Sequence, residues 1–225
     1  MQETKLLIVV GHYGSGKTEF CVNLVNRMKD CGLDTALADL DIVNPYFRSR
    51  ECREAFAHRG IKLVSNLMNN DPCLDSPAMS QEIQSFFMDN HRFNLMDIGG
   101  DAVGARVLAQ YREQIRNGQY EMLLVVNANR YQTQTPEEVI AYLRDIEQAS
   151  QLTITGLVNN THMLKETGIE DVLRGDRLCR AVSEQTGLPV RYACFLEPLA
   201  DAIQKLDILG ERFPLKLKMR ENWMS

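Results

Sequence analysis

The sequence predicts an α/β fold in which a mostly parallel sheet carries helices on both faces. Short apolar, β-branched runs alternate with amphipathic segments along all 225 residues, which is the pattern of repeated strand–helix units. With 44% apolar residues, a chain of this length can bury one large core. No internal repeat or low-complexity tract interrupts the alternation, so we expect a single domain that spans residues 1–225.

Apolar runs place the strands, and periodicity with capping residues places the helices. A helix from 136 to 149 is predicted to begin with a capping box, because Thr135 and Glu138 have the required spacing around Pro136. A second helix, from 169 to 186, is predicted to end before Gly187. Strands are expected near residues 5–10, 34–39, 61–64, 93–97, 121–126, 153–158 and 190–194.

A glycine-rich loop follows the first predicted strand and has a spacing that suits phosphate binding. A glycine and four further residues precede Gly-Lys-Thr, and the loop consists of Gly11, His12, Tyr13, Gly14, Ser15, Gly16, Lys17 and Thr18. The glycines allow backbone N–H groups to turn toward phosphate oxygens, and Lys17 brings a mobile charge to the β- and γ-phosphates. The hydroxyl of Thr18 can bind Mg²⁺. Strand, loop and helix come in the order that this phosphate-binding motif needs.

Acidic residues end two further predicted strands, at the sheet edge where the glycine loop is expected. One strand ends in Asp39, with Asp41 two positions further along, and another ends in Asp97. Because ligands of parallel sheets bind at the carboxyl ends of the strands, these carboxylates can hold Mg²⁺ through water or orient an attacking water. Gly99 and Gly100 follow Asp97 and predict a loop that moves when a γ-phosphate is present.

Composition argues against several other classes of protein. The formal net charge of −5 does not favour nucleic acid as a partner. No run approaches the roughly 20 apolar residues that span a bilayer, and Pro214 with the lack of a helical stripe argues against membrane contact by the C-terminal tail. The six cysteines include no Cys-x-x-Cys pair. We therefore expect a cytoplasmic protein with reduced thiols, since the first apolar run leads into the glycine loop and is no secretory signal.

The glycine loop, Asp39-Leu40-Asp41 and Asp97-Ile98-Gly99-Gly100 together resemble the MinD/ParA class of P-loop ATPases, within the CobQ/CobB/MinD/ParA group. That class includes septum-site and plasmid-partition ATPases, the nitrogenase iron protein and metal-insertion ATPases. Residues 39–50 are similar to one bacterial branch of the class. The resemblance covers nearly the whole chain in order and implies a P-loop NTPase fold of the MinD/ParA type.

The resemblance also implies a role for each motif residue. The catalytic set would be Lys17, Asp41 and Asp39, with Asp41 orienting the attacking water. Mg²⁺ would be held by Thr18, Asp97 and Asp39. ATP would be bound by residues 11–18, by Glu19 and by two asparagines, Asn159 and Asn160, of which Asn160 is the better match to the adenine-binding residue. Thr161-His162 stands where a guanine-binding Asn-Lys-x-Asp signature would continue, which favours ATP over GTP.

One loop position departs from the class. Many members carry a second lysine after the first glycine, and it reaches the nucleotide of a partner subunit, whereas this chain has His12 there. The homodimer of the class is therefore an open question for this chain. An arginine could supply the missing charge, and the candidates are Arg48, Arg50, Arg106 and Arg130.

These features favour an Mg²⁺-dependent ATPase that acts as a nucleotide-driven switch on a partner protein. A small-molecule kinase or ligase on the same fold is an alternative, and it would need an acceptor pocket beside the γ-phosphate. A scaffold or metal-delivery protein that binds nucleotide is a further alternative. Metal delivery would have to rely on isolated cysteines such as Cys52 or Cys73, because no paired motif is present.

Overall fold

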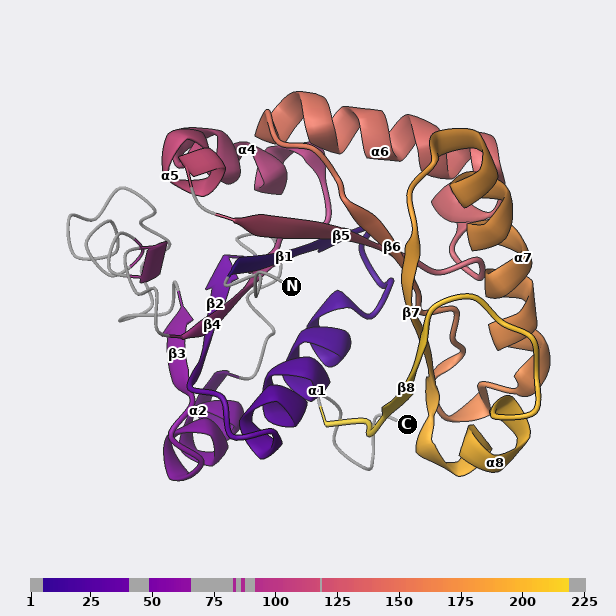
Figure 1. Cartoon of the computed structure of the whole chain (residues 1–225), viewed down its shortest axis with the longest axis horizontal. Coiled ribbons are helices and arrows are strands. Elements are labelled where there is room, and N and C mark those ends of the chain that lie inside the picture. Colours follow the sequence, from indigo (N-terminus) through magenta and orange to yellow (C-terminus); the bar gives the residue numbers. More distant parts are fainter. Residues whose placement is uncertain are drawn as a thin grey trace.

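The computed structural model describes residues 6–40, 49–65, 83, 86–87, 92–117 and 119–218, and only the backbone of residues 49–52 and 65. These residues form an eight-stranded parallel sheet between two layers of helices, as Figure 1 shows. The strand order is β3-β2-β4-β1-β5-β6-β7-β8. The strands are β1 Leu6–Gly11, β2 Thr35–Leu40, β3 Lys62–Ser65, β4 Phe93–Ile98, β5 Tyr120–Val126, β6 Gly156–Asn159, β7 Val190–Leu196 and β8 Glu211–Leu215. The predicted α/β class with a parallel sheet is confirmed.

The helices divide between the two faces of the sheet. Helices α1 (Lys17–Asp30) and α2 (Ser49–His58) cover one face. The other face is covered by α4 (Ala102–Gln110), α5 (Arg112–Asn117), α6 (Pro136–Ser150) and much of α7 (Ile169–Thr186). The structure also has a short helix, α8 (Ala200–Ile203), three 3-10 turns, Tyr131–Thr133, Leu164–Glu166 and Glu197–Leu199, and helical backbone at residues 83 and 86–87. None of the described helices is long and apolar enough to cross a membrane.

Strand β1 shows how the sequence builds two cores at once. Ile8 and Val10 pack into the core under α4 and α6, whereas Leu7 and Val9 pack into the core under α1. Successive side chains of a strand point to opposite faces, so a strand covered on both sides has to be apolar at every position. This is why β1 reads as an unbroken apolar run and why its end is held firmly at the centre of the sheet.

Most predicted elements are confirmed, and the differences have local causes. The capping box of α6 is present: Glu138 N donates to Thr135 Oγ1, and Thr135 N donates to Glu138 Oε2. Strand β6 starts later than predicted, at Gly156, because the hydroxyl of Thr155 accepts from Met122 N at 2.9 Å and so replaces a backbone carbonyl in the ladder. Strand β8 was not predicted, since Pro214 within its short sequence is tolerated only at a sheet edge.

Candidate functional site

The glycine loop joins the end of β1 to the start of α1 in the conformation that its sequence predicts. Ser15 N donates to His12 O at 3.0 Å and closes a tight turn. Gly14 has φ +74° and Gly16 has φ +81°, a left-handed conformation that favours glycine. Gly16 is also the N-cap of α1, so the helix begins at Lys17 with its unpaired N–H groups and positive dipole end at the loop. The loop is therefore shaped to receive an anion.

The predicted metal-binding residues meet at the base of this loop. Thr18 Oγ1 donates to Asp97 Oδ2 at 2.5 Å, across 79 positions of sequence. Strands β2 and β4 are neighbours, and their register sets Asp39 beside Asp97. Asp97 also pairs with Val9, whose side chain faces α1, so both carboxylates lie on the α1 side of the sheet. The sheet thus brings Asp97 into contact with Thr18 and sets Asp39 beside Asp97, and the binding of Mg²⁺ by these three residues stays a prediction.

This donor set fits Mg²⁺ and a phosphorylated ligand. Hydroxyl and carboxylate oxygens are the ligands that Mg²⁺ prefers, and one or two carboxylates beside phosphate oxygens suffice for it. Lys17 is 5% exposed and lies in the same region. Within the described part of the chain, the buried Ser15 Oγ has no hydrogen-bond partner, and a phosphate oxygen could accept from it. The described residues contain no cluster of three or more His, Cys, Asp or Glu side chains that could hold a metal alone.

A cysteine packed next to the carboxylates is not a candidate thiolate. Cys21 lies one turn beyond Lys17 on α1 and is fully buried. Burial, with a further contribution from the Asp97 carboxylate, raises the pKa of the Cys21 thiol well above its usual range. The thiol therefore stays protonated and acts as a small apolar residue.

The loop after β4 rests directly on the glycine loop. A Cβ atom added to Gly100 would lie 2.8 Å from Tyr13 N, 3.0 Å from Gly11 O and 3.1 Å from Lys17 Nζ, so only glycine fits. Tyr142 of α6 donates its hydroxyl proton to Gly100 O at 3.2 Å and holds this backbone in place. Asp101, directly after Gly100, caps α4 by accepting from Gly104 N.

The two predicted adenine-binding asparagines point to different places. Asn160 Nδ2 donates to Ser15 O at 2.8 Å, so this side chain lies against the glycine loop. Asn159 Nδ2 donates instead to Val172 O of α7, and a Cβ on Gly175 would lie 2.0 Å from Asn159 Oδ1. Asn159 therefore anchors α7 to the sheet, and Asn160 is the residue that faces the loop.

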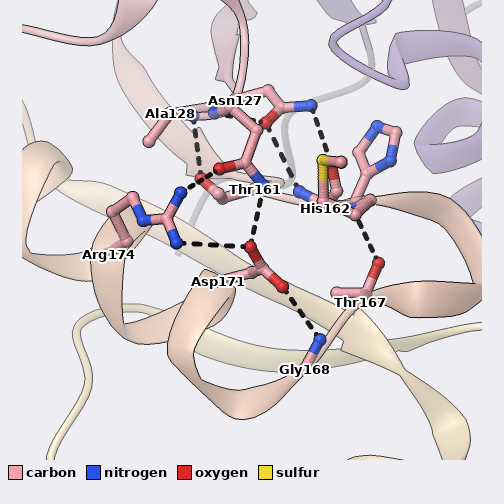
Figure 2. A network of polar contacts seen from close by, with 10 residues as sticks. Asn127, Ala128, Thr161, His162, Thr167, Gly168, Asp171 and Arg174 are labelled. Atoms are coloured by element: carbon pink, nitrogen blue, oxygen red, sulfur yellow. Dashed lines mark hydrogen bonds and ion pairs between the residues drawn. The ribbon is translucent and has the colours of Figure 1, made fainter.

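A polar network fixes the loops that follow β5 and β6, as Figure 2 shows. Asn127, which is fully buried, accepts at Oδ1 from Asn129 N and His162 N. Ala128 N donates to Thr161 Oγ1 at 3.0 Å. These contacts join the two loops to each other. The side chains of both loops that face the glycine loop are therefore held in fixed positions relative to one another.

The remaining predicted nucleotide-binding residues contact other parts of the protein or the solvent. The His12 ring lies 5.6 Å from the Tyr142 ring, and Tyr13 is 66% exposed. Glu19 Oε1 accepts from Lys218 N at 2.6 Å and from Asn23 Nδ2 at 3.2 Å, so this side chain ties the C-terminal segment to α1. Its role in nucleotide binding stays a prediction.

The two candidate arginines with described side chains lie in different places. Arg130 Nε donates to Gly14 O at 2.8 Å, which places this side chain on the glycine loop. Arg106 is exposed on α4. Arg48, the side chain of Arg50 and the predicted water-orienting Asp41 lie outside the described residues, as do the side chains of Cys52 and Cys73.

Sequence reasoning missed Asn127 and Tyr142 as parts of the site. Asn127 follows a buried apolar strand at the functional sheet edge, which is the same signal that identified Asp97. Tyr142 has no such signal, because it lies in the middle of an amphipathic helix and only packing brings it to Gly100.

Comparison with known proteins shows similarity at the level of the fold. The chain matches chloroplast FtsY from Physcomitrella patens (TM-score 0.56, 22% identity, 85% of this chain and 58% of that one). It also matches the signal recognition particle receptor FtsY from Elizabethkingia anophelis in complex with GDP (TM-score 0.53, 21% identity, 85% and 57%). The cell division protein FtsY from Thermotoga maritima is a further match (TM-score 0.54, 18% identity, 84% and 60%).

The fold is that of a P-loop NTPase. The glycine loop can accordingly be called the P-loop. No protein-family profile and no curated protein matches the chain. The chain spans less than two thirds of the length of the FtsY proteins it matches.

Proposed function

We propose that this protein is an Mg²⁺-dependent nucleoside triphosphatase that acts as a nucleotide-driven switch of the MinD/ParA type. The observation that carries the proposal is the hydrogen bond between Thr18 of the P-loop helix and Asp97 at the end of β4, beside the buried Lys17. A purely structural role for this group is a weaker explanation, because burying the Lys17 ammonium is costly unless an anion pairs with it, and a bound phosphate would supply that anion.

Each residue of the site has a proposed role in binding or hydrolysis. The P-loop amides and Lys17 bind the phosphates, and Lys17 stabilises the charge that develops on the transferred phosphoryl group. Thr18 and Asp97, with Asp39 beside them, would hold Mg²⁺. When bound, the ion neutralises phosphate charge and orients the phosphate oxygens. Asp41 is the proposed group that orients the attacking water.

We propose ATP as the nucleotide, with GTP as the second candidate. Guanine presents two adjacent N–H donors, which a carboxylate binds well. Three residues after Asn160, where an Asn-Lys-x-Asp signature would place that carboxylate, the chain has Met163, and this supports adenine. GTP is supported by one observation, namely that one FtsY neighbour is described in complex with GDP.

The switch function rests on Gly100. Its backbone touches the P-loop and lies beside Lys17, so a γ-phosphate bound there would contact or displace the loop after β4. Movement of that loop would pass to α4 and give a partner protein, or a second copy of the chain, a surface that depends on the nucleotide. A small-molecule kinase or ligase would use the same site with an acceptor in place of water.

Calorimetric titration with non-hydrolysable ATP and GTP analogues in Mg²⁺ tests the proposal directly. We expect Lys17→Ala to abolish binding, while the exposed Lys205→Ala serves as a matched control and binds like the wild type. Unchanged affinity in Lys17→Ala would contradict the proposed site.

Hydrolysis is measured separately, as release of inorganic phosphate. Asp41→Asn is expected to keep nucleotide binding but to slow phosphate release at least tenfold, about 1.4 kcal/mol in the barrier. Wild-type turnover in this variant would assign the water-orienting role to another group. Phosphate transfer to an added acceptor, with no free phosphate released, would favour the kinase alternative.

A further inference from the structure

We propose that Arg130 is a positioning residue that fixes the P-loop through Gly14 and supplies a second positive charge to the phosphate site in cis. The inference rests on the proposed nucleotide function and adds a named residue to it. Arg130 comes from the loop after β5, 116 positions away from Gly14 in sequence.

The contact between Arg130 and the P-loop is close and specific. Arg130 Nε donates to Gly14 O at 2.8 Å. A Cβ atom on Gly14 would lie 2.8 Å from Arg130 Cζ and 2.9 Å from Nε, so the guanidinium occupies the space where any other residue would have its side chain. The left-handed backbone favours glycine at position 14, and the absence of a side chain there leaves room for the guanidinium of Arg130.

Holding the Gly14 carbonyl sets the direction of the next N–H group. A trans peptide is planar, and its C=O and N–H point to opposite sides. With Gly14 O fixed by Arg130, Ser15 N is directed to His12 O, the bond that closes the turn. Asn160 fixes the following carbonyl, Ser15 O, and so directs Gly16 N to the opposite side. Two successive peptides of the P-loop are therefore set by two side chains from neighbouring loops.

The loop that carries Arg130 is itself rigid. Arg130 N donates to Asn127 O at 3.0 Å, and Thr133 Oγ1 donates to the same carbonyl at 2.8 Å. Asn127 is in turn bonded to the loop after β6, which carries Asn160. The guanidinium is accordingly placed before any nucleotide arrives, so little conformational entropy is lost when it contributes to binding.

Within the described part of the chain, the charge of Arg130 has no acidic partner, and its side chain donates a hydrogen bond only to the neutral carbonyl of Gly14. Arg174, from the same region, instead pairs with Asp171. Arg130 is half-buried, and a guanidinium that is partly removed from water is stabilised by a nearby anion. A phosphorylated ligand in the P-loop, which Arg130 contacts, would supply that anion.

Two substitutions at this position separate the charge from the general packing of the side chain. Arg130→Gln keeps a polar side chain but removes the charge, and Arg130→Lys keeps the charge. Arg112→Gln is a matched control, because Arg112 is an exposed arginine that bonds Gln151 at the surface. Adenosine and guanosine 5′-(β,γ-imido)triphosphate with Mg²⁺ are the probes, titrated at low and high salt, and thermal unfolding of the free proteins reports on the fold.

We expect Arg130→Gln to weaken binding about tenfold and to reduce its salt dependence, and Arg130→Lys to recover at least a third of the lost affinity. Arg112→Gln should bind like the wild type. Affinity of Arg130→Gln within twofold of the wild type would overturn the proposal, and equal losses in the Gln and Lys variants would overturn the role of the charge. If the wild type binds neither probe, the proposed function itself fails, and this result is distinct from the others.

Discussion

Replacing Gly100 by alanine tests how tightly the loop after β4 packs on the P-loop. The added methyl carbon would lie 2.8 Å from Tyr13 N, 3.0 Å from Gly11 O and 3.1 Å from Lys17 Nζ, where ordinary contacts begin at 3.4 Å. The first two neighbours are backbone atoms of the P-loop, and these cannot turn away as the end of a flexible side chain can. One of the two loops therefore has to move by several tenths of an ångström.

The size of the effect follows from the cost of overpacking. Forcing an extra methyl group into a well-packed site costs about 1–3 kcal/mol. The shift of the loop also strains the hydrogen bond between Tyr142 and Gly100. The net free energy of a hydrogen bond falls within the same range as this packing cost. For a protein of this size, a loss of 1 kcal/mol lowers the unfolding temperature by about 2–4 °C. We therefore expect Gly100→Ala to melt clearly below the wild type.

Urea and thermal unfolding of the free protein measure this loss without any ligand. Gly168→Ala is the matched control, because its backbone has φ −108° and its new methyl group would meet only Asp171 Oδ2, at 4.0 Å. A Gly100→Ala protein with wild-type stability would refute the close packing of the two loops. In the same variant, nucleotide affinity should fall about tenfold if the proposed function holds, since 1.4 kcal/mol corresponds to a factor of ten.

Two further predictions concern the scaffold around the site. Gly175→Ala should destabilise the fold by about 3 kcal/mol or more, because its methyl group would lie 2.0 Å from the bonded Asn159 oxygen; chemical unfolding measures this, and a loss below 1 kcal/mol would contradict it. Burial raises the pKa of the Tyr142 hydroxyl above that of an unfolded tyrosine, which is about 10. The protonated hydroxyl therefore contributes its full stabilisation below about pH 10, and this stabilisation is lost as the pH rises through the pKa of the folded state. Tyr142→Phe should therefore lower the free energy of unfolding by about 1 kcal/mol at pH 7 and give a shallower loss of stability above pH 10 in urea titrations; an unchanged alkaline slope would contradict this prediction.

Much of the framework was predictable because its signals are local. The helix that starts at Pro136 is encoded by a cap, a proline and a periodic apolar stripe within a few residues of one another. The P-loop is encoded in the same way, since its glycines supply the backbone freedom that the turn needs. The placement of Asp97 and Asp39 was also predicted, because carboxyl ends of parallel strands share one edge of a sheet.

Other features could not be predicted from local patterns. Strand β8 is short and contains Pro214, and its pairing with β7 decides that it is a strand. Asn159 and Asn160 are identical side chains next to each other, and only the alternation of a strand end sends one to α7 and the other to the P-loop.

The sequence alone determined the alternation of strands and helices, the conformation of the glycine loop and the placement of Asp39 and Asp97 at the same edge of the sheet. Only the tertiary structure decided which loops close over that site. The sheet places β4 and β5 on either side of β1, and this order brings Gly100 and Arg130 to opposite parts of the P-loop. Backbone dihedrals and periodicity are properties of a few neighbouring residues, whereas contacts between loops depend on which strand ends meet, and no local stretch of sequence specifies that.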